Sequence, residues 1–224
     1  MTQYNYKILN VVGDASPDPF SESSTQLYPL GTKLEYGDRT FRYAKMGSGA
    51  VTAGKLLQTK VAVGDHRDLA VPSGVSIGSS TITVTVGGTK ADANEYSEGY
   101  LHINDVDGQG QLFRIKSHPE GTSTNVVFTL YDKVNKALTG NSKADLIHSS
   151  YYELVIAPNN ETGAISGVTV IDMTAENYGW VQTSGPCSVL IEGTIVLGEN
   201  ACRSTGSTVG TVAASSGDAN CVVG

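Results

Sequence analysis

The stretch EGYLHINDVDGQGQLFRIK, residues 98–116, decides the fold class. Two runs of alternating apolar and polar side chains flank a loop of Asn, Asp and Gly residues. A period of two is typical of β-strands with one buried face, and such a loop is typical of a hairpin. We therefore predict a β-hairpin with Arg114 and Lys116 on its solvent face, where they could form an assembly contact. The residues predicted on the buried face are Leu101, Ile103, Phe113 and Ile115.

The composition of the whole chain agrees with a β fold and argues against one class of partner. A chain of 224 residues can form one β domain or two small ones, and 26 glycines suit short strands joined by tight turns. The hydrophobic fraction of 39% is enough for a core. The net charge of −7, with no cluster of Lys and Arg, argues against nucleic acid as a partner.

Further segments read as strands, and helices do not alternate with them, which argues against parallel βαβ units. Residues 125–131 are apolar on both faces, so we expect a strand buried on both sides. Residues 132–138 are the one helix candidate, of at most two turns. Other predicted strands include residues 34–36 and 41–43 around a Gly37-Asp38 turn, 55–63, 81–86, 151–157, 167–172 and 208–213, and a second hairpin of 178–182 with 187–192 that contains the single Trp180 as a core anchor.

The first 27 residues predict an N-terminal arm, because residues 14–24 contain few apolar side chains. The residues before them could add a strand to the chain's own sheet or to that of a neighbour, the alternative being a frayed terminus. The apolar residues concerned are Tyr4, Tyr6, Ile8, Leu9, Val11 and Val12. Residues 28–224 should form the β-rich domain, with two sub-lobes meeting near residues 120–150. The expected fold class is all-β: an antiparallel β-sandwich or barrel-like domain with an extended N-terminal arm and little helix.

One apparent catalytic motif lacks its context. Residues 66–69, His-Arg-Asp-Leu, match the start of a protein-kinase catalytic loop, but Ser73 stands where that loop needs Asn. The glycine-rich phosphate loop and the Asp-Phe-Gly motif of kinases are also missing from the sequence. We interpret the match as chance.

The hairpin loop superficially matches a calcium-binding loop. With Asp105 as the first position, Gly110 is the sixth, but the twelfth is Lys116 instead of a bidentate Glu. Asp, Asn and Gly are also the residues that tight turns require, so a turn is the favoured interpretation. A calcium-binding or carbohydrate-active β domain that uses Asp105 and Asp107 remains an alternative.

Other residue types give no site. The histidines have no ligand spacing, and Cys187, Cys202 and Cys221 form no Cys-x-x-Cys pair, so we expect free thiols and no zinc. Residues 160–162 fit a glycosylation acceptor, but Met1 to Asn10 do not resemble a signal peptide, and no apolar run could span a membrane. We predict no enzyme, no catalytic, cofactor-binding or metal-binding residues, and no cofactor.

Three blocks resemble the capsid decoration (cement) and related head proteins of tailed bacteriophages, especially marine ones. Together they cover most of residues 27–200. The blocks are LYPLGTKLEYGDRTFRYAK (27–45) with TAGKLLQ (52–58), the opening hairpin with FTLYD (128–132) and ALT (137–139), and YGWVQTSGPC (178–187).

The resemblance implies a non-enzymatic virion protein, made in the host cytoplasm and located on the capsid surface. It would bind and stabilise the shell of the major capsid protein, and would pair with copies of itself as a homotrimer. Nucleic acid and membrane are not expected partners. The alternative is another virion component, a tail or head-fibre protein that contacts host glycans through exposed Tyr, Asn and Asp side chains.

Overall fold

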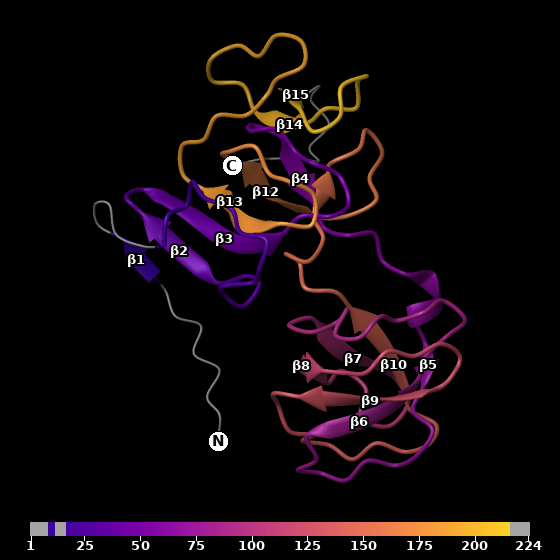
Figure 1. The fold of residues 1–224 in the computed structure, drawn as a ribbon. Helices are drawn as coiled ribbons and strands as arrows, with labels where there is room; N and C mark the ends of the chain where they lie inside the picture. The colour runs from indigo at the N-terminus through magenta and orange to yellow at the C-terminus, as the bar shows by residue number, and fades with distance from the viewer. Residues whose placement is uncertain (1–8, 12–16, 216–224) are drawn as a thin grey trace. The chain divides into compact units, whose positions relative to one another are not determined.

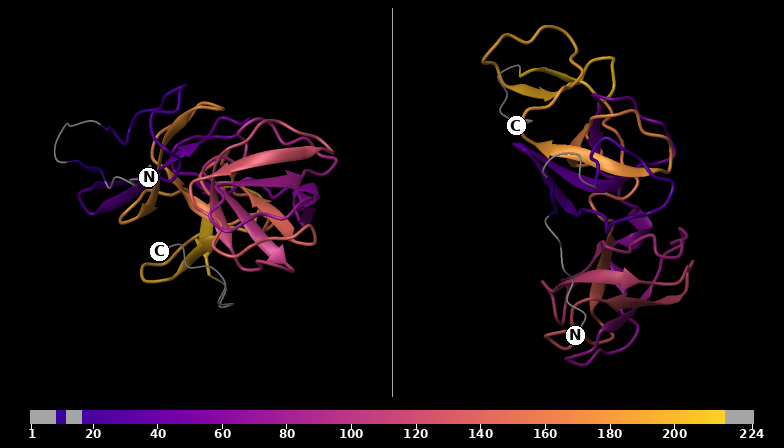
Figure 2. Two further views of the ribbon diagram at one scale, coloured as in Figure 1. Left: turned by 90° about the horizontal axis from the view of Figure 1, so that it is seen from below. Right: turned by 60° about the vertical axis from the view of Figure 1, so that its left-hand side comes forward.

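The computed structural model describes residues 9–11 and 17–215. Strands account for 37% of the residues and helix for 2%, so the predicted all-β fold is confirmed. The chain divides into two compact units, and the colours of Figures 1 and 2 separate them. Within the described residues, unit 1 comprises 9–11, 17–61 and 150–215, in indigo and orange to yellow, and unit 2 comprises 62–149, in magenta. Unit 2 is therefore an insertion in unit 1.

Unit 1 is built on a seven-stranded sheet with the strand order β1-β2-β3-β13-β12-β4-β11. Its neighbouring strands are antiparallel, apart from the parallel pair β1 and β2. A separate antiparallel ribbon consists of β14 and β15. The strands are β1 Leu9–Val11, β2 Lys33–Tyr36, β3 Arg39–Lys45, β4 Leu56–Gln58, β11 Val155–Ile156, β12 Ile165–Thr169, β13 Tyr178–Ser184, β14 Ala201–Arg203 and β15 Val212–Ala214.

Aromatic side chains hold the centre of this sheet together. Trp180 on β13 lies opposite Tyr43 on β3, with ring centroids 5.1 Å apart, and both side chains are buried. Tyr28 packs edge-on against Tyr43 at 5.2 Å. Aromatic pairs in such tilted arrangements stabilise a core beyond the area they bury. The prediction of Trp180 as a core anchor is confirmed.

Unit 2 is a nearly closed, barrel-like sheet with the order β5-β10-β7-β8-β9-β6. Its two end strands, β5 and β6, are also in contact, which brings the sheet close to closure. A short 3-10 helix, η1 Gly64–His66, precedes the first strand. The strands are β5 Leu69–Ala70, β6 Thr81–Thr85, β7 Tyr100–Asp105, β8 Leu112–Ser117, β9 Asn125–Leu130 and β10 Lys143–Ile147.

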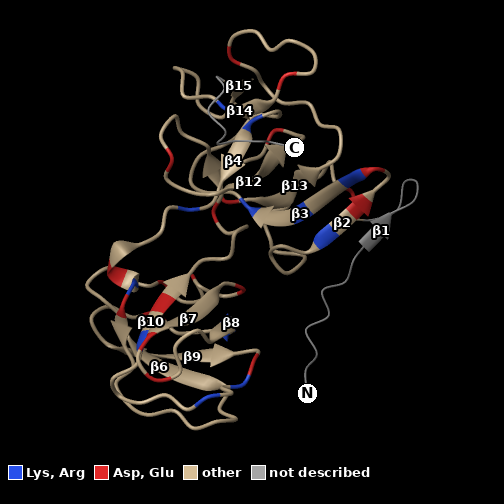
Figure 3. Ribbon diagram, turned by 180° about the vertical axis from the view of Figure 1, so that it is seen from behind, with Lys and Arg blue, Asp and Glu red and all other residues tan. Residues whose placement is uncertain are grey.

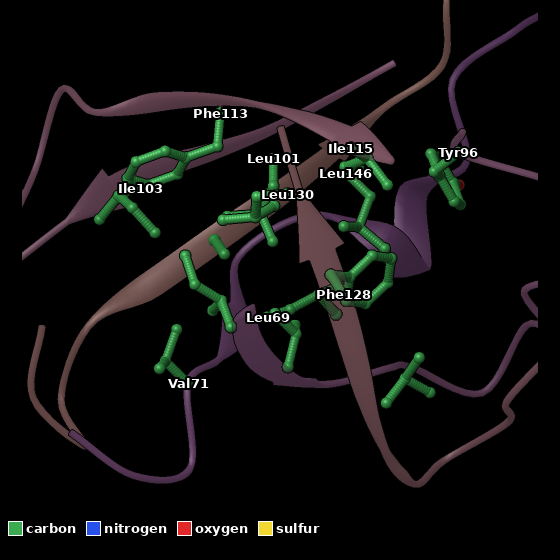
Figure 4. Close-up of a cluster of buried hydrophobic side chains, with 14 of the residues drawn as sticks. Leu69, Val71, Tyr96, Leu101, Ile103, Phe113, Ile115, Phe128, Leu130 and Leu146 are labelled. Atoms are coloured by element: carbon green, nitrogen blue, oxygen red, sulfur yellow. The ribbon is translucent and has the colours of Figure 1, made fainter. Parts of the chain in front are cut away.

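The interior of the barrel is apolar. Figure 4 shows side chains from β7, β8, β9 and β10 converging on one another, with Tyr96 at one end of the cluster. Strand alternation explains which residues enter, since every second side chain faces inward. The predicted hairpin is confirmed as β7 and β8, and its four predicted core residues are all buried.

Arg114 corrects one part of that prediction. Its residue exposure is 9%, so it does not lie on an open solvent face, whereas Lys116 is exposed. The chain after β9 explains the difference, because it continues alongside β8. The Tyr131 N–H donates to the Arg114 carbonyl, and the Asp132 carboxylate accepts from the Arg114 N–H at 2.8 Å.

Three other local predictions are wrong. Residues 125–131 are not buried on both sides: Val127 is 47% exposed, because a barrel has a single interior. Residues 132–138 form no helix, since the Gln111 side-chain oxygen accepts the N–H groups of Asn135 and Lys136. The second hairpin does not form. Strand β13 pairs instead with β3 and β12, and residues 187–192 make a single bridge, from Ile191 to Val212.

The N-terminal segment lies on unit 1. The predicted strand addition is seen for Leu9–Val11, which pairs with β2, while Tyr4, Tyr6, Ile8 and Val12 lie outside the described residues. Phe20 contacts the Tyr36 and Phe41 rings, at 6.0 and 6.4 Å between centroids, and Ser23 bridges to Tyr178. The two units divide at residues 61/62 and 149/150. We expected sub-lobes to meet near 120–150.

Adjacent valines on β9 test this description of the barrel. We predict that Val126→Thr lowers the free energy of unfolding by about 1–3 kcal/mol, because it buries a hydroxyl in an apolar interior. Val127→Thr, its matched control on the outer face, should change it by less than about 0.5 kcal/mol. Urea denaturation followed by circular dichroism measures both values. Equal losses would mean that β9 is buried on both sides after all.

Candidate functional site

A group of buried titratable side chains in unit 2 surrounds Tyr96, and we call it the histidine–tyrosine cluster. It consists of Tyr96, His66, His118, His148 and Glu95. Three of the chain's four histidines belong to it. Its members come from η1, from the segment before β7 and from residues just after β8 and β10. All of them are buried or nearly so, and Tyr96 is 0% exposed.

His66 ties the first turn of unit 2 to the cluster. The carbonyl of Thr89 can only accept, so the His66 Nε2–H donates to it, at 2.9 Å. This assigns the tautomer and leaves Nδ1 to accept the Tyr96 hydroxyl proton. Burial raises the pKa of Tyr96, and nearby Glu95 adds to this effect. The hydroxyl therefore remains a proton donor across the physiological range.

His118 and His148 contact Tyr96 in different ways. The His118 Nε2 accepts the backbone N–H of Tyr96 at 3.0 Å, so its Nδ1 carries the proton and donates to the Pro119 carbonyl at 2.8 Å. The His148 ring stacks on Tyr96, with centroids 4.3 Å apart, and its Nε2 lies 3.0 Å from Glu95 Oε1. Burial lowers the pKa of His118, although its hydrogen bond to Pro119 opposes this.

These contacts fasten the segment before β7 to the barrel. Both ring nitrogens of His66 and His118 are occupied by protein groups, which leaves them no free position for a substrate or a metal. In the part of the chain that the structure describes, no group of three or more His, Cys, Asp or Glu residues could hold a metal ion. The chemical property that these contacts give the cluster is sensitivity to pH through His118, whose pKa is lowered by burial.

The residues of the kinase-like match make different structural contacts. His66 belongs to the cluster, while Asp68 has a positive φ of 52° and its N–H donates to Asp145 at 2.8 Å. In a kinase catalytic loop this Asp would act as the catalytic base. Here His66 and Asp68 fix a turn before β5.

The acidic residues of the hairpin loop accept hydrogen bonds from other protein groups. Asp105 Oδ1 accepts the N–H of Val106 at 2.8 Å, and Asp107 Oδ2 accepts the Thr139 hydroxyl at 2.9 Å. Gly108 has a φ of +81°, as a tight turn requires. The geometry is that of a turn pinned to the segment before β10.

Unit 1 holds a network of charged residues centred on Lys45. Its Nζ lies 3.0 Å from Glu153 and 2.8 Å from Glu176, and Glu153 also pairs with Lys60 at 2.9 Å. Burial alone would lower the pKa of Lys45, but the two carboxylates outweigh it and raise the value. Lys60 and Lys45 each lie 5.2 Å from the Tyr152 ring centre. This network links β3 to the segment before β11.

Gln182 lines two of the cavities in unit 1. One, of about 300 Å³, is lined by Tyr151, Ser166 and Thr183, and the other, of about 550 Å³, by Phe20 and Arg39 among others. The Gln182 amide donates to three carbonyls, those of Ser184, Gly185 and Pro186, at 2.8–3.2 Å. Gln182 therefore holds the turn after β13 in place.

The two described cysteines and the glycosylation-like sequence all lie in unit 1. Cys187 and Cys202 are free thiols, as predicted, and Cys221 lies outside the described residues. Thr162 of the Asn-Glu-Thr sequence accepts from Gln58 Nε2 at 2.7 Å, and Glu161 pairs with Arg203 at 3.1 Å. These residues hold the loop after β11 in place.

Local sequence patterns did not predict the histidine–tyrosine cluster. Its histidines are far apart in the sequence and show no ligand spacing, so only the closure of the barrel brings them together. A usable signal was the placement of all four histidines between residues 62 and 149, which is the extent of unit 2.

Comparison with family models, curated proteins and solved structures found no match to this chain. Within the described ranges, no helix has the length and apolar character needed to cross a membrane.

Unit 2 should lose stability in mild acid while unit 1 does not. His118 has a lowered folded pKa, so below its unfolded value of 6.5 the unfolded chain binds a proton that the folded chain does not. The free energy of unfolding therefore decreases as the pH is lowered, by at most about 1.4 kcal/mol per pH unit for each such proton. Unit 1 has no histidine. Burial opposes a lower pKa for Glu153, but its lysine partners outweigh burial and lower the value. This shift affects the stability of unit 1 only below pH 4.5.

Two readouts on the full chain separate the units. Protection factors of amides in peptides from residues 62–149, which are corrected for the intrinsic pH dependence of hydrogen exchange, should fall between pH 6.5 and 5, while the fluorescence of Trp180 in unit 1 should show an unchanged melting temperature. Equal acid sensitivity of both units would contradict the assignment to His118.

A second variant tests the hydrogen bond to His66. Tyr96→Phe should cost about 1–3 kcal/mol of unfolding free energy, because it leaves the buried His66 Nδ1 without a donor. Tyr100→Phe, at a half-exposed position on β7, is the matched control and should cost less than about 0.5 kcal/mol. Chemical denaturation compares the two, and similar small losses would show that the hydroxyl contributes little.

Proposed function

We propose that this chain is a non-enzymatic virion structural protein, a capsid decoration (cement) protein that binds and stabilises a shell of major capsid protein. Its partners are that shell and neighbouring copies of itself, and its place is the capsid surface. The sequence resemblance of the three blocks is the starting point, and the arrangement of those blocks supports it.

The first and third blocks form one continuous part of the sheet in unit 1. Strands β2 and β3 come from the first block and β13 from the third, and β13 pairs with β3 over most of its length. Blocks that lie far apart in the sequence thus contribute neighbouring strands. The second block contributes β7 and β8 of unit 2.

The observation that carries the proposal is the position of β1. It is the first strand in the sheet order and pairs in parallel with β2. Within the described residues it has a partner strand on one side, so its other edge can pair with a strand of another protein. Repeated on a symmetric lattice, modest contacts of this kind become effective through avidity.

Binding to heads tests the proposal. Purified protein is mixed with expanded, undecorated heads made of the major capsid protein, and the bound fraction is measured by co-sedimentation. Saturable binding is expected. Its absence, or immunolabelling of the tail instead of the head, would contradict the proposal.

Truncation tests the role of β1. Removing residues 1–16 should weaken head binding by about 10-fold or more through loss of the edge strand, with little change in the melting of unit 1 followed by Trp180 fluorescence. Residues 17–27 are kept because Phe20 and Ser23 pack on the sheet. Removing residues 1–8, which leaves β1 intact, is the matched control and should preserve binding. A parallel loss of binding and melting temperature would mean that β1 belongs to the core of unit 1.

A further inference from the structure

The segment between β13 and β14 exposes apolar side chains, and we call residues 188–199 the apolar loop. Four of its aliphatic side chains are open to solvent: Leu190 is 43% exposed, Ile191 56%, Val196 60% and Leu197 103%. Single exposed aliphatic residues are ordinary on a protein surface. Four within eight residues concentrate exposed apolar side chains on one loop, as interaction sites often do.

The base of the apolar loop is fixed to unit 1, so the exposure does not come from a lack of contacts. The Leu190 N–H donates to the Gly54 carbonyl at 2.8 Å, and Ile191 bridges to Val212. Val189 and Ile195 pack against the buried cluster that contains Leu56 and Val168. Side chains of the loop therefore divide into an inward set and an outward set.

A carboxylate reinforces this base. The Glu192 side chain accepts the Ser204 hydroxyl and the N–H groups of Ser207 and Thr208. These hydrogen bonds lower the pKa of Glu192, the one from Ser204 having the largest effect. Glu192 thus stays ionised and holds the loop against the segment that leads to β15.

The tip of the apolar loop is a tight turn. The Glu199 N–H donates to the Val196 carbonyl at 3.0 Å, and the Glu199 carboxylate accepts the Val196 N–H at 2.9 Å. Gly198 has a φ of +93°, the conformation that the third position of a type II turn requires. Leu197 occupies the second position, where its side chain projects from the turn. Binding therefore needs little ordering of the backbone, which favours affinity.

The charge of the loop indicates the kind of partner. Residues 188–199 contain Glu192 and Glu199 and no Lys or Arg, and Figure 3 shows acidic positions on this loop without basic ones. Loops that insert into membranes usually combine apolar residues with basic and aromatic side chains. An aliphatic tip with acidic flanks fits instead an apolar pocket with a basic rim on another protein.

We propose that the apolar loop is a docking element whose Val196–Leu197 tip enters an apolar, basic-rimmed pocket of the shell protein. This inference rests on the proposed function and assigns one contact within it. It gives unit 1 a second attachment point besides the edge of β1.

Affinity for undecorated, expanded heads tests the proposal on the full chain. Leu197→Asp should weaken binding by about 10- to 100-fold, the effect of withholding one leucine from an apolar pocket. Ile77→Asp, at a 67% exposed position in unit 2, is the matched control and should bind as the wild type does. Both variants should keep the wild-type melting temperature, because both side chains are exposed. Two further measurements are made without heads. Sedimentation velocity detects self-association, and flotation with vesicles of phosphatidylcholine and phosphatidylglycerol detects lipid binding.

The outcomes separate this inference from the proposed function. Saturable binding of the wild type and of Leu197→Asp with equal affinity overturns the inference and leaves the decoration function standing. Failure of the wild type to bind heads overturns both. If the wild type self-associates and Leu197→Asp does not, the occupant is a second copy of the chain. If the wild type floats with vesicles and Leu197→Asp does not, the occupant is a lipid surface. Either result overturns the inference.

Discussion

The pairing of β3 with β13 is the contact on which unit 1 depends. These strands bracket the whole of unit 2 in the sequence, yet they pair from Tyr178 opposite Lys45 to Ser184 opposite Thr40. Their facing aromatic side chains, Tyr43 and Trp180, fill the space on one side of the sheet. Strands β2 and β12 then extend the sheet on either side. A chain that failed to make this pairing would have two separate halves of a sheet, each with its apolar face open to water.

Local sequence patterns predicted what is local in this fold. Alternation and turn residues were sufficient for the hairpins β2–β3 and β7–β8 and for β6, because each depends on neighbouring residues. They failed where a distant segment decides the outcome. Strand β13 resembled half of a hairpin but pairs with β3, and Arg114 alternates like a solvent-facing residue but is only 9% exposed, beside the chain after β9. The histidine–tyrosine cluster has no local pattern, since barrel closure brings its members together.

The two units differ in the kind of chemistry they contain. Unit 2 holds all four histidines, and two of them, His66 and His118, accept hydrogen bonds from the buried Tyr96. Unit 1 holds the ionic network of Lys45, the edge strand β1 and the apolar loop. The two features used by the proposed contacts, β1 and the apolar loop, both belong to unit 1. The buried histidine with a lowered pKa, His118, belongs to unit 2.

The insertion of unit 2 also sets an order of folding during synthesis. Residues 62–149 are contiguous, so unit 2 can close as soon as they have left the ribosome, whereas unit 1 must wait for β13. The first and last strands of unit 2, β5 and β10, pair with each other and bring Leu69 beside Ala144. The early closure therefore shortens the effective loop between β3 and β13 and reduces the entropy lost when they meet. Folding of the inserted unit therefore favours folding of the unit that contains it.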